Sequence, residues 1–218
     1  MRIFQIGAAG GVGRPLAQLL TARGEDVTGM HRKPEQAEAI TATNATAVPG
    51  DLVQDTVADL AAKMSGHDAV VFSAGAHGAG TEQTTLIDGN GLKKAAEAAE
   101  QAGVSRFVLV SVFPEAGRGP DSPEAFEHYM RIKKDADVHV AATGLEWLIV
   151  RPGTLVDTAG NGRVTAGPAI PYGTIPRTDV AAFIDAALAK PALNRVIVEL
   201  TGGNTPVTEA VAALTSTP

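Results

Sequence analysis

Tyr129 and Lys133 form a Tyr-x-x-x-Lys pair whose types and spacing suggest proton-transfer chemistry. On a helix, residues four positions apart share a face, so the ammonium is expected beside the phenol. A neighbouring cation favours the phenolate, which predicts that the pKa of Tyr129 is lowered from about 10. A tyrosine so placed can donate a proton to a carbonyl oxygen. The alternative is a chance pair on an ordinary helix.

A glycine-rich turn near the N-terminus indicates a second site. Gly7, Gly10 and Gly13 follow a short apolar run and precede residues with helical apolar spacing. The first glycine permits a tight turn, the second lets the backbone approach a pyrophosphate, and the third lets helix and strand pack closely. Free N–H groups at the start of the helix, including those of Gly11 and Val12, can then face phosphates. The turn predicts a bound dinucleotide, and the alternative is a turn without a ligand.

The end of the second apolar run indicates which dinucleotide binds. Many NAD enzymes place a carboxylate here to accept a hydrogen bond from the ribose 2′-hydroxyl, but this run ends in Arg32 and Lys33. A guanidinium can pair bidentately with a 2′-phosphate. We therefore expect NADP rather than NAD, with Arg32 as the main contact and Lys33 or Arg14 in support. A solvated basic turn is the alternative.

The elements that must position these residues alternate along the chain. Short apolar runs predict strands, and longer runs with helical apolar spacing predict helices. Thr178 is the predicted N-cap of one helix, and Gly103 is the predicted stop of another. This alternation implies right-handed crossovers and a parallel sheet that is buried on both faces. The predicted strands are 2–6, 26–30, 69–72, 107–110, 147–150 and 196–200, and the predicted helices are 12–22, 34–40, 84–102, 125–142, 179–189 and 208–214.

The expected architecture is an α/β Rossmann fold, a doubly wound parallel sheet with helices on both faces. No linker, repeat or low-complexity segment interrupts residues 1–218, so one domain is predicted. The substrate-side elements are expected mainly in 153–218, as a small C-terminal extension. In open α/β sheets, ligands bind at the carboxyl edge of the strands, which this extension would cover.

Composition excludes several classes of function. With 44% hydrophobic and 19% charged residues, the chain has an ordinary globular composition. A net charge of −6 disfavours a nucleic-acid partner. No run of 18 apolar residues exists to span a membrane, and the N-terminal apolar run is too short for a signal peptide. A cytoplasmic protein without nucleic-acid or membrane partners is expected.

Metal and thiol chemistry are not expected either. The chain has no cysteine, which excludes disulfides and thiol catalysis. Its five histidines lack the spacing of a metal site. They are His31, His67, His77, His128 and His139.

The spacing of the glycine turn resembles a known family. Ala8 and Ala9 separate the first two glycines, which resembles the extended and atypical branches of the short-chain dehydrogenase/reductase superfamily. Over nearly its whole length, the chain is similar to the atypical group of NAD(P)H-binding, or NmrA-like, proteins. The pieces that carry this resemblance are, in chain order, Gly50-Asp51-Leu52, Ser73-Ala74-Gly75, Gly103-Val104-Ser105-Arg106-Phe107-Val108, Arg151-Pro152-Gly153 and Thr178-Asp179-Val180-Ala181.

The resemblance also implies roles for individual residues. By similarity, Lys133 also bonds the nicotinamide ribose hydroxyls. The implied neighbours of the cofactor are Asp51 and Leu52 near adenine, Ser73, Ala74 and Gly75 beside the ribose, and Pro152 in the turn past the nicotinamide.

Ser111 and Asp88 depart from the family pattern. In relatives a run of serines follows the fifth strand, but here Val112 and Phe113 follow Ser111. Two interpretations of Ser111 stay open: it orients a carbonyl, or it only touches the nicotinamide or caps the strand. Extended relatives commonly carry asparagine where this chain has Asp88, so a proton relay through this position is not expected.

The predicted function is that of an NADP-dependent reductase of a small carbonyl, quinone or related acceptor. Tyr129 would donate the proton, with Lys133 and Ser111 completing the catalytic set, in a monomer or homodimer. Flavin or biliverdin-type reduction is a variant of this hypothesis. A non-catalytic redox sensor is one alternative, although sensor branches often lose the tyrosine. A nucleotide-sugar epimerase or dehydratase is another, although such enzymes usually carry a larger C-terminal domain.

Overall fold

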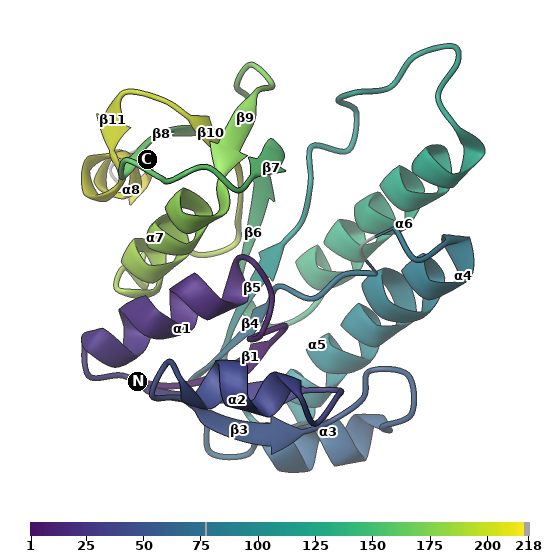
Figure 1. Ribbon diagram of the computed structural model, residues 1–218, viewed down its shortest axis with the longest axis vertical. Helices are drawn as coiled ribbons and strands as arrows, with labels where there is room; N and C mark the ends of the chain where they lie inside the picture. Colours follow the sequence, from purple (N-terminus) through teal and green to yellow (C-terminus); the bar gives the residue numbers. More distant parts are fainter. Residues whose placement is uncertain (77, 216–218) are drawn as a thin grey trace.

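A nine-stranded sheet runs through the centre of the computed structural model (Figure 1). The structure describes residues 1–76 and 78–215, so His77, one of the histidines considered above, lies outside the described residues. The strand order is β11-β8-β10-β6-β5-β4-β1-β2-β3. The strands are β1 (Arg2–Ile6), β2 (Asp26–His31), β3 (Thr46–Pro49), β4 (Ala69–Phe72), β5 (Arg106–Val110), β6 (Glu146–Pro152), β8 (Arg163–Gly167), β10 (Val196–Gly202) and β11 (Thr205–Pro206).

The stretch from β3 to β10 is parallel throughout, which confirms the predicted doubly wound α/β sheet. The sequence did not indicate the antiparallel edge, where β8 pairs with β10 and β11 pairs with β8. A second sheet of two parallel strands, β7 (Thr154–Val156) and β9 (Thr174–Pro176), lies above the carboxyl edge. These two strands lie in a glycine- and proline-rich stretch. Because each is only three residues long and depends on pairing with the other, local periodicity does not predict them.

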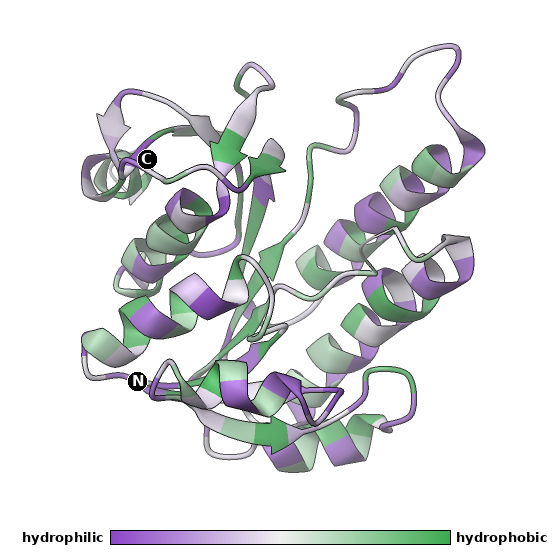
Figure 2. Cartoon of the chain, viewed as in Figure 1, coloured by the Kyte–Doolittle hydropathy of each residue, from purple (hydrophilic) through white to green (hydrophobic). Residues whose placement is uncertain are grey.

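Both faces of the central sheet are buried, as the apolar strands predict. Along β5, Phe107 and Leu109 pack into one hydrophobic cluster, and Val108 and Val110 pack into the other. In Figure 2 the strands at the centre are mostly hydrophobic. Helices α1, α7 and α8 cover one face, and α3, α5 and α6 cover the other. The helices are α1 (Gly13–Ala22), α2 (Gln36–Thr41), α3 (Val57–Met64), α4 (Thr81–Gln83), α5 (Leu92–Gln101), α6 (Glu124–Ala141), α7 (Arg177–Leu188) and α8 (Val207–Thr215).

The predicted helix 84–102 is not one α-helix. Its first half is a π-helix, η1 (Thr84–Gly91), which continues into α5. Gly91 lets η1 pack closely against Leu52, since a Cβ on Gly91 would lie 3.0 Å from Cβ of Leu52. The wider π turn also directs Asp88 at the loop after β4, where its Oδ2 accepts a hydrogen bond from the backbone N–H of Ala76 at 2.9 Å. Such π segments often accompany functional sites.

Two further helices, α7 and α3, also differ from the sequence-based expectation. Helix α7 begins at Arg177, and no side chain caps it, so the predicted N-cap role of Thr178 is wrong. The Thr178 hydroxyl instead accepts a hydrogen bond from the backbone N–H of Gly160. Helix α3 was not predicted, although its capping box, Thr56 with Asp59, is a local signal. Gly103 follows α5 with φ +71°, as its predicted role as a helix stop requires.

Among the described residues, no helix is long and apolar enough to cross a membrane.

Candidate functional site

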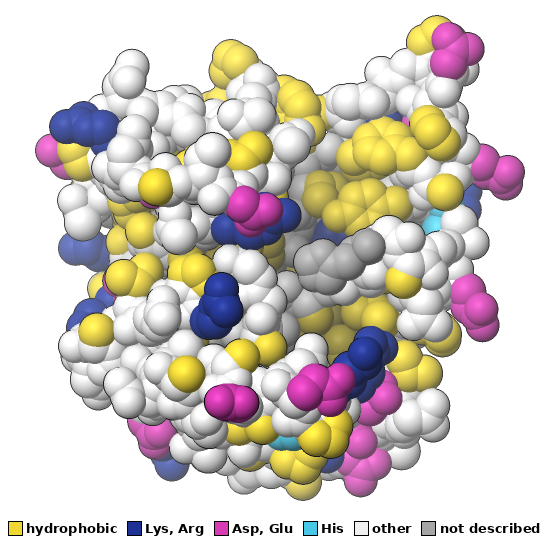
Figure 3. All heavy atoms as spheres, viewed as in Figure 1, with side chains coloured by type: hydrophobic (Ala, Val, Ile, Leu, Met, Phe, Trp, Pro, Cys, Tyr) yellow, Lys and Arg dark blue, Asp and Glu magenta, His cyan; other side chains and the backbone are white. Residues whose placement is uncertain are grey.

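Two cavities open side by side at the carboxyl edge of the parallel strands. One, called the glycine-turn cavity, is bordered by Gly7, Gly10 and Arg32. The other, called the tyrosine cavity, is bordered by Ser111, Tyr129 and Lys133, and has a volume of about 560 Å³. Figure 3 shows this face hollowed near its centre, with hydrophobic side chains along one wall. Ser73, Ala74 and Gly75 line both cavities, so the two cavities adjoin each other at this turn.

The glycine turn leaves no room for side chains at its two ends. Gly7 has φ +88°, and a Cβ on it would lie 2.6 Å from the backbone nitrogen of Ala74. A Cβ on Gly13 would lie 2.1 Å from the carbonyl oxygen of Gly7. These contacts explain the close approach of α1 to β1 that the motif predicts.

The middle of the turn presents unused donors. The backbone N–H groups of Gly11 and Val12 donate no hydrogen bond to any group that the structure describes. Gly7 and Gly10 border the glycine-turn cavity, whereas Gly11, Val12 and Gly13 do not. The Val12 side chain is buried in the core beneath α1. A ligand that reached Gly11 and Val12 would therefore meet their backbone.

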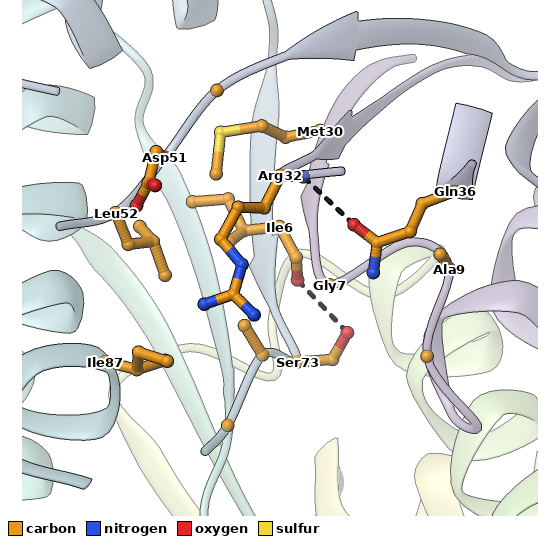
Figure 4. Close-up of a pocket in the computed structure, with 14 residues that line it drawn as sticks. Ile6, Gly7, Ala9, Met30, Arg32, Gln36, Asp51, Leu52, Ser73 and Ile87 are labelled. Carbon is orange, nitrogen blue, oxygen red and sulfur yellow. Dashed lines mark hydrogen bonds between the residues drawn. The ribbon is translucent and has the colours of Figure 1, made fainter. Parts of the chain in front are cut away.

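Arg32 borders the far end of the glycine-turn cavity (Figure 4). The figure shows its guanidinium over the pocket, on the side toward Leu52, and no carboxylate of the described residues pairs with it. Lys33 does not border the cavity, and its Nζ lies 4.0 Å from a carboxylate oxygen of exposed Glu35. Arg14 is exposed and borders neither cavity.

Gln36 was missed by the sequence analysis. Its Oε1 accepts hydrogen bonds from the backbone N–H groups of Arg32 at 3.1 Å and of Lys33 at 2.9 Å. This holds the basic turn in place while the Gln36 side chain itself lines the pocket (Figure 4). The only available signal was a glutamine at the start of the helix that follows the basic turn.

The opposite wall of the glycine-turn cavity comes from the turns after β3 and β4. Asp51 and Leu52 line it, and Oδ1 of Asp51 accepts a hydrogen bond from the backbone N–H of Val53 at 2.7 Å. The Ser73 hydroxyl donates to the carbonyl oxygen of Ile6 at 3.2 Å. The structure thus brings these family-implied residues to the same cavity as the glycine turn.

Lys133 is buried and held on two sides. Its Nζ donates to the carbonyl oxygen of Val110 at 3.2 Å and lies 3.6 Å from Oδ1 of Asp88. Both side chains are at most 4% exposed, so this is a buried ion pair. An ammonium has three N–H donors, which leaves one for a group in the tyrosine cavity.

The predicted lowering of the Tyr129 pKa is wrong. Burial raises the pKa of Tyr129 above its ordinary value, and the Asp88 carboxylate raises it further. Asp88 also balances the charge of Lys133, the cation that was expected to favour the phenolate. Tyr129 therefore keeps its proton at neutral pH.

Ser111 borders the tyrosine cavity and is only 3% exposed. Its backbone N–H donates to the carbonyl oxygen of Val150 at 2.7 Å, so the parallel pairing of β5 and β6 continues to this residue. On β6, Arg151 donates from its Nε to Oδ2 of the buried Asp137 at 2.8 Å. Pro152, the next residue of β6, also lines the cavity.

The walls of the tyrosine cavity are largely apolar. Phe113 and Tyr172 meet edge to face with ring centroids 5.3 Å apart, and Phe126 and Leu155 also line the cavity. The Tyr172 hydroxyl lies 2.6 Å from the hydroxyl of Thr154. Tyr172 therefore both lines the cavity and anchors its own loop.

Arg177 is a second residue that the sequence analysis missed. It borders the tyrosine cavity, and its side chain lies so close to Gly11 that a Cβ there would be 2.5 Å from its Cδ. Its Nη1 pairs with Oδ1 of Asp157 at 2.7 Å, and the Asp157 side chain is 88% exposed. The chain order gave no sign of this contact, because Arg177 reaches the turn only through the packing of α7 on α1.

Within the described part of the chain, no group of three or more histidine, aspartate or glutamate side chains is placed to hold a metal ion.

Comparison with known proteins identifies the family. The model of the NAD(P)H-binding family matches residues 7–191, and the chain belongs to this family. The chain is 37% identical over 216 residues to a Bacillus subtilis protein named "Uncharacterized sugar epimerase YhfK", covering 98% of this chain and 100% of that protein. The resemblance to atypical short-chain dehydrogenase/reductase proteins is thereby confirmed.

Solved structures give the same result. A Bacillus halodurans protein provisionally named as an NAD-dependent epimerase/dehydratase is similar with a TM-score of 0.89 and 31% identity, covering 98% of this chain and 99% of that one. The oxidoreductase ylbE from Lactococcus lactis is similar with a TM-score of 0.87 and 27% identity, covering 98% and 96%. Related proteins thus include oxidoreductases and epimerase-like proteins.

The residues present fit a dinucleotide on structural grounds alone. Gly7 and Gly10 let a ligand approach the backbone, and the N–H groups of Gly11 and Val12 are unused donors within the described residues. Donors of this kind at the start of a helix suit a pyrophosphate. The two adjoining cavities then offer room for the two halves of the ligand.

Proposed function

We propose that this protein is an NADP-dependent oxidoreductase that reduces a small carbonyl, quinone or related acceptor. The observation that carries the proposal is that Tyr129, Lys133 and Ser111 border one cavity, which adjoins the glycine-turn cavity at Ser73 and Ala74. An acceptor in the tyrosine cavity would thus lie next to the cofactor and within reach of a proton donor.

In this proposal the chain's own residues bind, orient and protonate. Bound NADPH would supply the hydride to the acceptor carbon. Tyr129, which is protonated at neutral pH, would donate its proton to the acceptor oxygen. Lys133, fixed by Asp88 and the carbonyl oxygen of Val110, uses its remaining N–H to hold the ribose hydroxyls.

The preference for NADP rests on Arg32. Its guanidinium borders the glycine-turn cavity, and no described carboxylate neutralises it. A 2′-phosphate would provide the partner that it lacks, through charge-assisted hydrogen bonds. Arg177, which lies over Gly11, would add a second cation near the pyrophosphate.

The raised pKa also bears on the epimerase alternative that the names of relatives suggest. An epimerase of nucleotide sugars first oxidises a hydroxyl and needs a base to take its proton. A tyrosine that keeps its proton suits reduction better. The apolar walls formed by Phe113, Phe126 and Leu155 also suit a flat apolar acceptor better than a polyhydroxylated sugar. A redox sensor would share the cofactor groove without using Tyr129.

The test is NADPH oxidation with a panel of aldehydes, quinones, flavins and nucleotide sugars. Tyr129→Phe should lower kcat by about 10²- to 10⁴-fold, the usual contribution of a positioned acid. The matched control is Tyr172→Phe, which removes the other phenol of the same cavity and should lower kcat by less than about 10-fold. Tight NADPH binding with no turnover of any acceptor would favour the sensor and refute the proposed reductase.

A further inference from the structure

Arg177 contacts the glycine turn and also borders the tyrosine cavity. It is the first residue of α7, which packs beside α1 (Figure 1). Its side chain lies over the turn, since a Cβ on Gly11 would be 2.5 Å from Cδ of Arg177 and 3.0 Å from its Nε. Arg177 is therefore packed against the residue whose free backbone N–H suits a pyrophosphate.

Most of the hydrogen-bonding capacity of Arg177 is unused. A guanidinium has five N–H donors. With the described residues it makes one hydrogen bond, from Nη1 to Oδ1 of Asp157 at 2.7 Å. The side chain of Asp157 is 88% exposed, whereas that of Arg177 is 25% exposed. Because an ion pair with so exposed a partner contributes little to stability, another anion can replace Asp157 at little cost.

The loop that carries Asp157 is held against α7 by contacts that do not involve Arg177. Thr178 and Asp179 accept hydrogen bonds of 2.9 to 3.2 Å from the backbone N–H groups of residues 160–162. Asp179 is only 3% exposed, so these bonds are sheltered from water. The loop therefore stays within reach of Arg177, and its position does not depend on the ion pair.

We propose that Arg177 is a clamp for the pyrophosphate of the bound dinucleotide, and that Asp157 is the counter-ion that the pyrophosphate displaces. Without a ligand, Asp157 holds the guanidinium. When a pyrophosphate meets the N–H groups of Gly11 and Val12, the guanidinium donates to it instead. The exchange is favourable, because a charge-assisted fork of hydrogen bonds to phosphate is stronger than an exposed ion pair. The inference deepens the proposed function, and it rests on its dinucleotide site and not on the reduction.

The clamp predicts that Arg177 and Arg32 recognise different parts of the ligand. Arg177→Gln should weaken the binding of NADPH and of NADH alike, by about 10- to 100-fold, because both carry the pyrophosphate. Arg32→Ala should weaken only that of NADPH. Adenosine 2′-phosphate, which has no pyrophosphate, should bind Arg177→Gln as tightly as it binds the wild type. The matched control is Arg163→Gln on β8, since Arg163 borders neither cavity.

The effect of Asp157 has the opposite sign, which separates a clamp from an arginine that only fixes a loop. Asp157→Asn removes the competing charge and should tighten the binding of both dinucleotides by about 2- to 5-fold, the strength of an exposed ion pair. If Arg177 only fixed the loop, Asp157→Asn would loosen the same contact and weaken binding. In a chain that already carries Arg177→Gln, Asp157→Asn should change neither affinity, because its partner is gone.

Calorimetric titration of the full chain with NADPH, NADH and adenosine 2′-phosphate measures these Kd values without turnover. Folding of each variant is checked by denaturant unfolding. Arg177→Lys keeps the charge but not the fork of donors, so its affinities should lie between those of wild type and Arg177→Gln, and it replaces Arg177→Gln if that variant does not fold.

The outcomes are distinct. If no acceptor is reduced but Arg177→Gln weakens the binding of both dinucleotides and Asp157→Asn tightens it, the proposed reductase fails and the clamp stands. The clamp is overturned if Arg177→Gln binds both dinucleotides as tightly as the wild type, or if Asp157→Asn binds them no more tightly. A loss of affinity for adenosine 2′-phosphate in Arg177→Gln, equal to that for NADPH, would also overturn it.

Discussion

Replacing Arg32 by alanine should reduce the preference of this protein for NADP over NAD. Arg32 borders the glycine-turn cavity and has no carboxylate partner among the described residues. A 2′-phosphate would be its only strong partner, and NAD has no such group. The substitution should therefore weaken NADP binding and leave NAD binding nearly unchanged.

The size of the effect follows from the exposure of the side chain. A hydrogen bond to a charged group contributes about 1.5–3 kcal/mol. Because Arg32 is exposed, we expect the lower end, about 1.5 kcal/mol, which corresponds to roughly a 10-fold change in the ratio of the two Kd values. Lys33 is a matched control, since it already has Glu35 as a neighbour and does not border the cavity. Lys33→Ala should change the ratio by less than about 5-fold.

The assay is direct titration of each variant with NADPH and NADH, followed by cofactor fluorescence, at two salt concentrations. The loss in Arg32→Ala should be larger at low salt, because screening weakens a charge pair at the surface. An Arg32→Ala variant with the wild-type ratio of Kd values would refute the reasoning. A larger change in the ratio of Kd values for Lys33→Ala than for Arg32→Ala would show that Lys33, and not Arg32, makes the phosphate contact.

Three further predictions concern stability, and denaturant unfolding measures all of them. Gly13→Ala should cost about 1–3 kcal/mol or more, because its Cβ would meet a backbone carbonyl oxygen at 2.1 Å, whereas Gly11→Ala meets only a movable side chain and should cost less. Equal costs would contradict this. Asp179→Ala should cost about 1–3 kcal/mol, because the buried Asp179 accepts hydrogen bonds from two backbone N–H groups. Because the pKa of Asp137 is raised in the folded protein, the stability linked to its protonated form is lost as pH rises, so Asp137→Asn should gain relative to wild type with increasing pH. If the difference in free energy of unfolding between Asp137→Asn and wild type did not vary with pH, this prediction would be wrong.

Local sequence patterns predicted much of the fold and part of the candidate site. The alternation of apolar strands and amphipathic helices needs no long-range information, and it predicted the parallel sheet correctly. The turn at Gly7, Gly10 and Gly13 was recognisable because its glycines are close in the chain and their spacing reflects backbone geometry. The edge strands β8 and β11 were missed because their partners lie far away in sequence.

Residues that act through distant contacts could not be found in this way. Arg177 touches Gly11 across more than 160 residues of chain, and its role near the turn depends on the packing of α7 against α1. Gln36 and Asp137 likewise look like ordinary helix residues in the sequence. Their hydrogen bonds to the basic turn and to Arg151 give them their importance.

The sequence by itself determined that this is a Rossmann-type α/β protein with a glycine turn for a dinucleotide and a Tyr-x-x-x-Lys pair on one helix. Those features depend on spacing along a single element or between neighbouring ones. Only the tertiary structure decided the direction in which the pKa of Tyr129 is shifted. Spacing within α6 predicted a lowered pKa from Lys133, but burial and Asp88, brought in by η1, raise it instead. The electrostatics of a site depend on everything that surrounds it, and most of those neighbours are distant in the chain.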